Sequence, residues 1–497
     1  MKKTFITMSV FFILLGYNNC SNQGLESYVL STAENSSTSP SDNNSSSTPA
    51  DDDSPSSSSK GEININSVNQ VSSNSFKILG SGFSLKKQHS AILYDHGSEA
   101  LENGILNTYH KSLPDMHKIQ RIDEDPNTLW HKPSLGSTDS VNTGMRISKS
   151  RPGRYPGDEA HYYAKGNNNF LGWPSAYGGF ETNSNSKRVY TAFWIKLPFD
   201  LQNYYAIPAD SAQTRFIQNG DEEYGEYIQI EGIKEPGRII AHKNIGSIPE
   251  GWLFFEPPRV KGRPSMAGKK ITGLTSGAEV TFPLNSSKSK FDGRGFLSPR
   301  GKYLRLWSSG DGNGYRYSIA NLGVAGTGGT IWANTFEYNN LIPQQWNFME
   351  VAIDLGDSEL NRNPSLNVWI NGKMYLQSGP EWVEGMKKAE ATKTGDHGLT
   401  IALLGINDFM PVPFSLDLDD IYLDNSFHRV LLCNKAQLSE IRDKTGHCEV
   451  QKINLWNDST IEFNLYLGAL KSADKKFLYL FDENGNSNSN GFEIKDL

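Results

Sequence analysis

From residue 61 onward, apolar and polar residues alternate in short runs that are separated by Gly, Asn, Asp and Pro. In the run 302–307, Leu304 and Leu306 fall on one side of an extended chain, and the residues between them fall on the other. Alternation with a period of two is typical of β-strands. We expect further strands in four segments: 188–196, 346–354, 365–370 and 398–405.

Turn signals separate these runs, and helical periodicity is scarce. Asn371-Gly372 directly follows one predicted strand and favours a tight hairpin turn. The clearest helical pattern is short and covers 435–444. Many short strands with turn residues between them are typical of antiparallel sandwiches and jelly rolls. The pattern therefore predicts an all-β protein.

The first 60 residues lack this alternation. Two lysines precede an apolar stretch, 5–16, which is too short to cross a bilayer and suits a signal peptide covering 1–19. Cys20 follows where lipoproteins carry their acylated cysteine, and ordinary cleavage with an unmodified Cys20 is the alternative. We expect an exported lipoprotein, anchored at the outer membrane or the cell surface.

The rest of this region, 20–60, is dominated by Ser, Asn, Asp and Pro and has almost no apolar residues after residue 30. Such a segment cannot bury enough apolar surface to offset its chain entropy. We therefore expect a lipid anchor followed by a disordered stalk, which would separate the membrane from the folded body.

The composition of the whole chain argues against one class of partner. The formal net charge is −7, and 37% of the residues are hydrophobic. A protein that binds nucleic acid needs a basic face to neutralise phosphates, so nucleic acid is not an expected partner. The polar, glycine-rich composition is typical of a loop-rich extracellular protein.

Two cysteines, Cys433 and Cys448, lie near the end of the chain. If Cys20 carries a lipid, these two remain as an even pair in an oxidising compartment. We expect them to form a disulfide. Two buried free thiols are the alternative.

Segments at the two ends of the folded part resemble one module. The run SFKILGSGF at 75–83 resembles the start of an IPT/TIG domain, which is an immunoglobulin-like module. Residues 429–494 resemble the later strands of the same module. We predict one domain made of 61–99 and 428–497 and interrupted by a long insertion. Two separate small β modules are the alternative.

The insertion, 100–427, resembles a concanavalin-like jelly roll. The runs WNFMEVAID at 346–354, LNVWING at 366–372 and LDLDDIYLD at 416–424 match a pattern that recurs in laminin-G-like domains and in jelly-roll polysaccharide lyases. The resemblance implies a glycan ligand on a concave sheet. It implies no particular activity, because one fold hosts many functions.

Aromatic and basic residues on the expected concave face are the candidate ligand-binding set. Sugars bind to aromatic platforms, while charged groups fix their hydroxyls. The alternative is that these side chains are ordinary core residues and cross-strand pairs. The candidates are Tyr303, Arg305, Trp307, Tyr315, Tyr317 and Trp332.

No residue spacing dictates a catalytic site. A lyase needs a base and a group that neutralises the developing charge, but His161, His242 and His397 are scattered and expected in loops or on the surface. A glycosidase needs paired carboxylates, and Asp417 and Asp419 share a strand face but do not match an E-x-D-x-x-E-like hydrolase signature. Catalytic residues therefore stay unassigned.

Acidic residues on the last predicted strand of the jelly roll are candidate ligands of a structural calcium ion, a hard cation that binds carboxylates. They are Asp417, Asp419 and Asp420. The alternative places them on the solvent face of that strand. No other cofactor is predicted.

These features predict a surface-exposed lipoprotein that binds a glycan or another cell-surface component and is not an enzyme. The first alternative is a polysaccharide-degrading enzyme, with a lyase favoured over a hydrolase. The second is a structural or adhesive protein. The expected partners are a polysaccharide or cell-surface glycan and, through the lipid anchor, a membrane.

Overall fold

The structure is a computed structural model that describes the folded body in stretches. The predicted signal peptide, the lipidation of Cys20 and the Ser-rich stalk lie outside the described residues and stay predictions. The described residues are 62–96, 108–109, 116–118, 130–131, 134–135, 144–148, 151–158, 161–165, 169–171, 173–174, 186–199, 205–208, 215–219, 224–241, 252–258, 265–282, 302–308, 316–320, 323–326, 341–357, 362–377, 384, 399–407, 415–442 and 446–495.

The described body is all-β, as predicted, and its strands pair antiparallel. The largest sheet, called the central sheet below, has ten strands in the order β24-β23-β22-β12-β26-β9-β8-β5-β4, with β3 also paired to β26. Their bounds are β3 Leu93–Asp95, β4 Thr108–Tyr109, β5 Met116–Lys118, β8 Gly144–Ser148, β9 His161–Lys165, β12 Arg188–Lys196, β22 Trp346–Asp354, β23 Ser365–Ile370, β24 Lys373–Gln377 and β26 Ser415–Asp424.

A second sheet, called the β19 sheet, has six strands in the order β21-β20-β19-β25-β10-β7. Its strands are β7 Ser134–Leu135, β10 Asn169–Leu171, β19 Lys302–Ser308, β20 Arg316–Ala320, β21 Gly323–Gly326 and β25 Leu399–Asn407. A separate two-stranded pair joins β6 Trp130–His131 to β11 Trp173–Pro174. Strand β25 contacts β12, β26 and β9, so the β19 sheet packs on one face of the central sheet.

The other face of the central sheet packs against two four-stranded sheets, called the terminal module. One has the order β1-β2-β30-β29 and the other β28-β27-β31-β32. Their strands are β1 Asn64–Gln70, β2 Ser75–Ser81, β27 Arg429–Cys433, β28 Cys448–Val450, β29 Lys452–Trp456, β30 Thr460–Asn464, β31 Lys476–Phe481 and β32 Phe492–Ile494. One buried cluster contains residues of the terminal module and of β12, β22 and β26.

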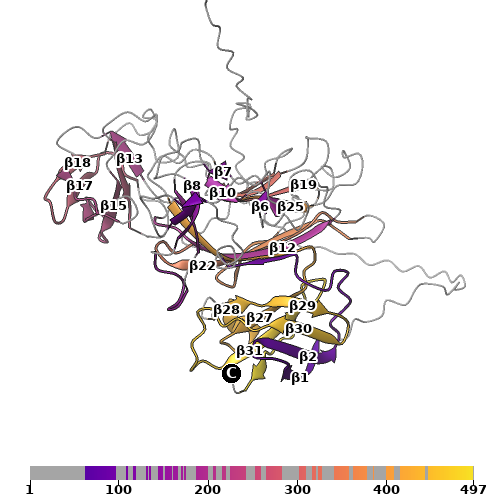
Figure 1. The fold of residues 1–497 in the computed structure, drawn as a ribbon. Helices are drawn as coiled ribbons and strands as arrows, with labels where there is room; N and C mark the ends of the chain where they lie inside the picture. Colours follow the sequence, from indigo (N-terminus) through magenta and orange to yellow (C-terminus); the bar gives the residue numbers. More distant parts are fainter. Residues whose placement is uncertain are drawn as a thin grey trace, which may run out of the picture. The chain divides into compact units, whose positions relative to one another are not determined.

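Residues from both ends of the described chain share one sheet of the terminal module. Strand β2 pairs with β30, with Ile78 opposite Ile461, and Figure 1 shows indigo β1 and β2 beside yellow β29 and β30. The single split domain and its IPT/TIG identity both stay predictions. Strand β3, which lies within the predicted segment 61–99, pairs with β26 of the central sheet.

The predicted disulfide and turn are both present. Cys433 on β27 is bonded to Cys448 on β28, which confirms the disulfide. Asn371 and Gly372 both have positive φ, at 51° and 77°, between β23 and β24. A two-residue hairpin loop with this backbone is the turn that Asn-Gly favours.

The sequence did not single out a further six-stranded sheet inside the predicted jelly roll. This β15 sheet has the order β13-β16-β15-β14-β17-β18 and its own apolar cluster, which includes Ile228, Ile239 and Phe255. Its strands are β13 Tyr205–Pro208, β14 Tyr227–Ile230, β15 Gly237–Ala241, β16 Trp252–Glu256, β17 Lys270–Gly273 and β18 Glu279–Thr281.

One short helix, α3 Leu438–Arg442, lies within the segment in which a helix was expected. Ile441 is its buried residue, and the remainder of the helix is at least partly exposed. Among the described residues, no helix has both the length and the apolar character needed to cross a membrane.

Strand β12 explains how the central sheet is covered on both sides. Its inner residues are all buried, which is typical of a strand with protein on both faces. Tyr190 and Trp194 belong to the cluster shared with the terminal module. Phe193 and Ile195 alternate with them and therefore face the β19 sheet.

Candidate functional site

The predicted ligand face lies in part on the β19 sheet. Tyr303, Arg305 and Trp307 are on β19, in the middle of the sheet, and Tyr317 is on β20. The backbone register places Trp307 opposite Arg316. For these four residues the structure describes the backbone position and not the side chain. Two further candidates lie wholly outside the described residues: Tyr315 and Trp332.

The acidic residues of β26 are buried, which contradicts the alternative that placed them on a solvent face. Asp417, Asp419 and Asp420 are 2%, 1% and 4% exposed. Between β12 and β26 the register shifts, with Ala192 opposite Tyr422 but Trp194 opposite Asp419. The extra residue on β26 is a β-bulge.

This bulge changes the direction in which the side chain of Asp420 points. Asp420 has a φ of 46°, and its backbone N–H donates to the carboxylate of Asp419 over 2.9 Å. Two consecutive residues of a regular strand point to opposite faces. Here both carboxylates reach the same cation, Arg154.

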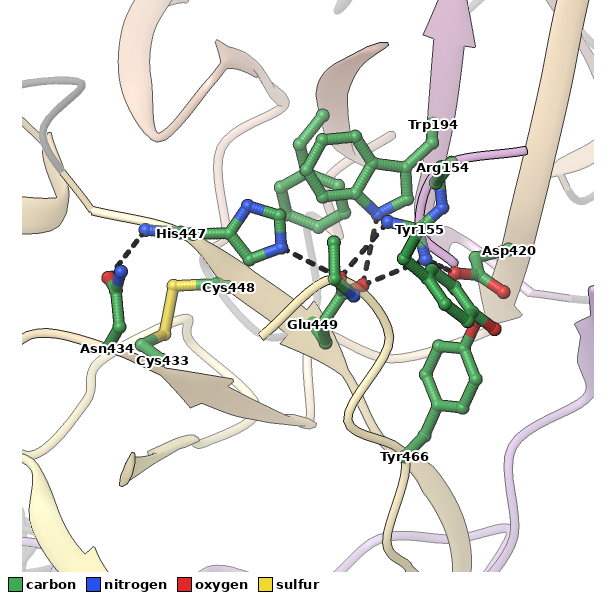
Figure 2. A network of polar contacts seen from close by, with 12 residues as sticks. Arg154, Tyr155, Trp194, Asp420, Cys433, Asn434, His447, Cys448, Glu449 and Tyr466 are labelled. Atoms are coloured by element: carbon green, nitrogen blue, oxygen red, sulfur yellow. Dashed lines mark hydrogen bonds and ion pairs between the residues drawn. A yellow bond between two sulfur atoms is a disulfide. The ribbon is translucent and has the colours of Figure 1, made fainter. Parts of the chain in front are cut away.

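Arg154 is the centre of a buried network that joins the central sheet to the terminal module (Figure 2). Its Nε donates to Asp419 over 3.0 Å, and its Nη2 donates to Asp420. Its Nη1 donates to Glu449 on β28 over 3.0 Å. The guanidinium carbon also lies 4.5 Å from the ring centre of Trp194. One arginine thus bonds to two strands that belong to different sheets.

Glu449 has three further donors. The imidazole of His447 donates over 2.7 Å, the indole of Trp194 over 3.2 Å, and the backbone N–H of Ala469 over 2.8 Å. Burial acts to raise the pKa of Glu449, but Arg154 and His447 outweigh it and hold that pKa below its usual value. Glu449 is therefore a buried, charged anchor.

A second network surrounds Asp417. Arg151 binds both carboxylate oxygens, over 2.7 and 3.0 Å, and His161 donates from Nε2 over 2.9 Å. Burial raises the pKa of Asp417, but the hydrogen bonds from His161 and Arg151 overcome this and lower it. His161 is 1% exposed on β9, so the expected surface or loop position is wrong for this histidine.

The arginine pairing bears on the calcium hypothesis. Each carboxylate of Asp417, Asp419 and Asp420 is bonded to a guanidinium, which supplies the positive charge that a metal ion would otherwise bring. Within the part of the chain that is described, no group of His, Cys, Asp or Glu has the arrangement of a metal site. The structure gives these carboxylates an anchoring role.

Further buried ion pairs reinforce the same boundary. Lys86 follows β2 and lies 3.0 Å from Asp424 of β26, with both side chains fully buried. Glu350 of β22 accepts a hydrogen bond from Tyr190 over 3.0 Å and lies 3.5 Å from Arg429 of β27. Buried charges fix the geometry in which they are paired, because any other arrangement leaves them uncompensated.

Sequence reasoning missed Arg151, Arg154 and Glu449. Arg154 lies 265 residues from Asp419 and 295 residues from Glu449, so no local spacing links them. The available signal was two arginines within one short segment, RPGR at 151–154, whose Pro and Gly residues indicate a turn and not a buried strand.

No protein-family model matches the chain, and no curated protein matches it. Among solved structures, the chain is similar to "Cellulose induced protein, Cip1", at 14% identity and a TM-score of 0.21, over 58% of this chain and 90% of that one. It is also similar to the binding domain of Paraclostridial Mosquitocidal Protein 1, at 10% identity and a TM-score of 0.23, over 72% of this chain and 68% of that one. At TM-scores this low, neither likeness carries an argument about the fold or function of this chain.

Proposed function

We propose that the protein is an exported, surface-exposed lipoprotein that binds a glycan or another cell-surface component through the β19 sheet. The ligand face consists of the positions of Arg305 and Trp307, together with Arg316, which lies opposite Trp307 on the neighbouring strand. Tyr317 lies opposite Leu306 and therefore belongs to the other side of the sheet. The terminal module serves as the structural base on which this binding domain is mounted.

The observation that carries this proposal is the register of β19. Leu304 is 1% exposed and lies opposite Leu404 of β25, which is fully buried. Leu304 therefore marks the core side of β19. The register with β20 is regular from Leu304 to Trp307, so positions 305 and 307 belong to the opposite side of the sheet, whereas position 303 lies at a shift in register. Aromatic and basic residues side by side on one sheet face suit a carbohydrate.

The central sheet offers no comparable face on its middle strands. All residues of β26 are buried, and the inner residues of β12 and β22 are buried as well. One side of these strands faces the β19 sheet, and the other side holds the ion pairs to the terminal module. To reach these strands, a polymer ligand would have to displace either the β19 sheet or the terminal module. The β19 sheet itself is therefore the better candidate for a ligand face.

The proposal is tested by binding of the full-length protein to a glycan array, with the bound glycans also assayed for new unsaturated ends by ultraviolet absorbance. We expect binding without a change in absorbance, and loss of binding in Trp307→Ala. Tyr227→Ala is the matched control, since Tyr227 is a 49% exposed aromatic residue on the β15 sheet.

Two outcomes would overturn the proposal. A rise in absorbance would make the protein a polysaccharide lyase, with Arg305 and the neighbouring tyrosines as the residues to examine. Retention of full glycan binding by Trp307→Ala, with loss in Tyr227→Ala, would move the ligand face away from the β19 sheet.

A further inference from the structure

A serine and a histidine lie in hydrogen-bond contact where the terminal module joins the central sheet. The Oγ atom of Ser84, which follows β2, lies 2.9 Å from the Nε2 atom of His428, which precedes β27. The two residues are 344 positions apart in the sequence. Ser84 is partly exposed, whereas His428 is 1% exposed. The pair therefore has a hydroxyl-bearing residue that a solute can reach and an imidazole that is held in the interior.

Hydrogen bonds behind His428 determine which of its ring nitrogens carries the proton. The Oγ atom of Ser426 lies 3.1 Å from Nδ1 of His428 and 2.9 Å from Oδ1 of Asp424. The other carboxylate oxygen of Asp424 is paired with Lys86 over 3.0 Å, so this carboxylate is an acceptor. The single hydroxyl proton of Ser426 is therefore donated to Asp424, and its oxygen accepts from Nδ1–H of His428. A neutral imidazole with its proton on Nδ1 has a lone pair at Nε2.

That lone pair faces the hydroxyl of Ser84. The Oγ atom of Ser84 also lies 2.6 Å from the carbonyl oxygen of Phe83, which is an alternative acceptor for its one proton. If the proton went to Phe83, two lone pairs would face each other across the 2.9 Å contact with His428. Donation from Ser84 to Nε2 of His428 avoids this repulsion. A hydroxyl bonded to a base that is itself oriented by a third group is the arrangement that activates a serine.

The backbone at Ser84 is held in an uncommon conformation. Its φ is 57°, in the left-handed region that residues other than glycine seldom adopt. The indole N–H of Trp456 donates to the carbonyl oxygens of Phe83 and Ser84, over 3.2 and 3.1 Å, and the Trp456 ring lies 4.9 Å from that of His428. Backbone strain that the surrounding structure enforces is concentrated at functional sites. A strained turn after a strand also presents the nucleophilic serine of α/β-hydrolases.

A backbone donor lies beside the same hydroxyl. The N–H of Glu483 points to Oγ of Ser84 over 3.5 Å, and the carbonyl of Glu483 accepts from Arg188 over 2.8 Å. When a carbonyl carbon is bonded to Oγ, its oxygen lies within reach of this N–H, which would stabilise the negative charge that develops there. Leu85, the next residue, is 67% exposed and offers an apolar surface for an acyl group.

We propose that Ser84 is a nucleophile activated by His428 and that it accepts the acyl group of a small carboxylic ester. Oγ of Ser84 bonds to the ester carbonyl carbon, and its proton passes to Nε2 of His428. The bond to the alcohol oxygen then breaks, and the alcohol leaves with that proton. Water attacks the acyl-serine, gives its proton to His428 and releases the carboxylic acid, while Ser84 recovers its proton. This activity goes beyond glycan binding and does not depend on it.

The test is labelling of the full-length protein by a fluorophosphonate probe, which bonds covalently to activated serines, followed by peptide mass mapping. Release of 4-nitrophenol from 4-nitrophenyl acetate is measured in parallel. We expect the label on Ser84 and hydrolysis of the ester. Ser84→Ala should abolish both, and His428→Gln should slow both by about a hundredfold, which is typical of a lost general base. Ser81→Ala is the matched control, since Ser81 is an exposed serine at the end of β2.

Ser426→Ala is a second variant that stays informative if His428→Gln does not fold. Because Ser426 orients the imidazole without touching the ester, its removal should lower kcat for 4-nitrophenyl acetate and leave KM unchanged. Trp307→Ala should keep both labelling and hydrolysis, so failure of the glycan proposal is distinguishable from failure of this one. Absence of label on Ser84 in the folded wild type would overturn the inference. So would labelling at the wild-type rate in folded His428→Gln, or an unchanged kcat in Ser426→Ala.

Discussion

On one face of the central sheet, β12 buries apolar residues such as Phe193 and Ile195 toward the β19 sheet. On the other face, the same strand places Trp194 beside Arg154 and Glu449, among several buried ion pairs. Apolar packing depends mainly on area and volume and tolerates exchange between similar side chains. Buried charges demand specific partners. The comparison teaches that the charged face sets the orientation of the terminal module, while the apolar face supplies non-directional stability.

Removal of the central cation should give the largest effect. Arg154→Met leaves the carboxylates of Asp419, Asp420 and Glu449 buried without their shared partner. We expect a loss of about 3–5 kcal/mol in the free energy of unfolding, measured by urea denaturation. Lys270→Gln is the control, because its ion pair with Glu279 is half exposed and should be worth less than about 1 kcal/mol. Equal losses in both variants would contradict the proposed role of the network.

Removal of the disulfide should have the next largest effect. Cys433 and Cys448 close a loop with a sequence separation of 15 residues. In the chain-entropy model, a loop of this length stabilises the folded state by about 3 kcal/mol. The double variant Cys433→Ser, Cys448→Ser should therefore lose about that amount in urea denaturation. A loss near zero would mean that the buried charges alone hold β27 and β28 together.

Acidification should weaken the charged face. The pKa of Glu449 is lowered in the folded state, so its charge contributes stability above the unfolded pKa, about 4.3. That contribution is lost as the pH falls through the folded pKa. The difference in unfolding free energy between the wild type and Glu449→Gln should therefore shrink from pH 7 toward pH 3.

The neighbouring aspartate provides an internal check on this sign. Burial raises the pKa of Asp419 well above its usual value, although Arg154 opposes the shift. Its protonation in the folded state therefore favours folding as the pH falls. Asp419→Asn should consequently gain stability relative to the wild type as the pH rises from 3 to 7, opposite to Glu449→Gln. The same trend in both variants would contradict the assignment of these two shifts.

The smallest effect is expected on the apolar face. Ile195→Val deletes one buried methyl group between β12 and the β19 sheet. Such changes cost about 0.5–1.5 kcal/mol. Thermal unfolding of this variant should show one small downward shift of the midpoint. A loss as large as that of Arg154→Met would remove the distinction between the two faces.

Local signals made much of the fold predictable. The alternation of apolar and polar residues identified strands β19, β12, β22 and β23. The dipeptide Asn371-Gly372 identified the turn that follows β23. The disulfide was predictable because two cysteines remain as an even pair in the oxidising compartment that is expected for an exported protein. The pairing of β2 with β30 agrees with the split arrangement suggested by resemblance, although this pairing does not identify the family.

The site was less predictable, for physical reasons. Strand alternation shows which residues share a face, as for Asp417 and Asp419, but not whether another sheet covers that face. The solvent-facing interpretation therefore failed for both. The bulge at Asp420 and the partners Arg154 and Glu449 depend on tertiary contacts across hundreds of residues. The β15 sheet was missed because its short strands were not distinguished from loops within the segment 100–427.

The most direct test of the account measures glycan affinity in two variants at a temperature where both stay folded. The account predicts that Trp307→Ala loses glycan binding but keeps its stability, whereas Arg154→Met loses stability but keeps its glycan affinity. Loss of affinity in Arg154→Met with retention in Trp307→Ala would contradict it, because the ligand face would then belong to the boundary between the central sheet and the terminal module.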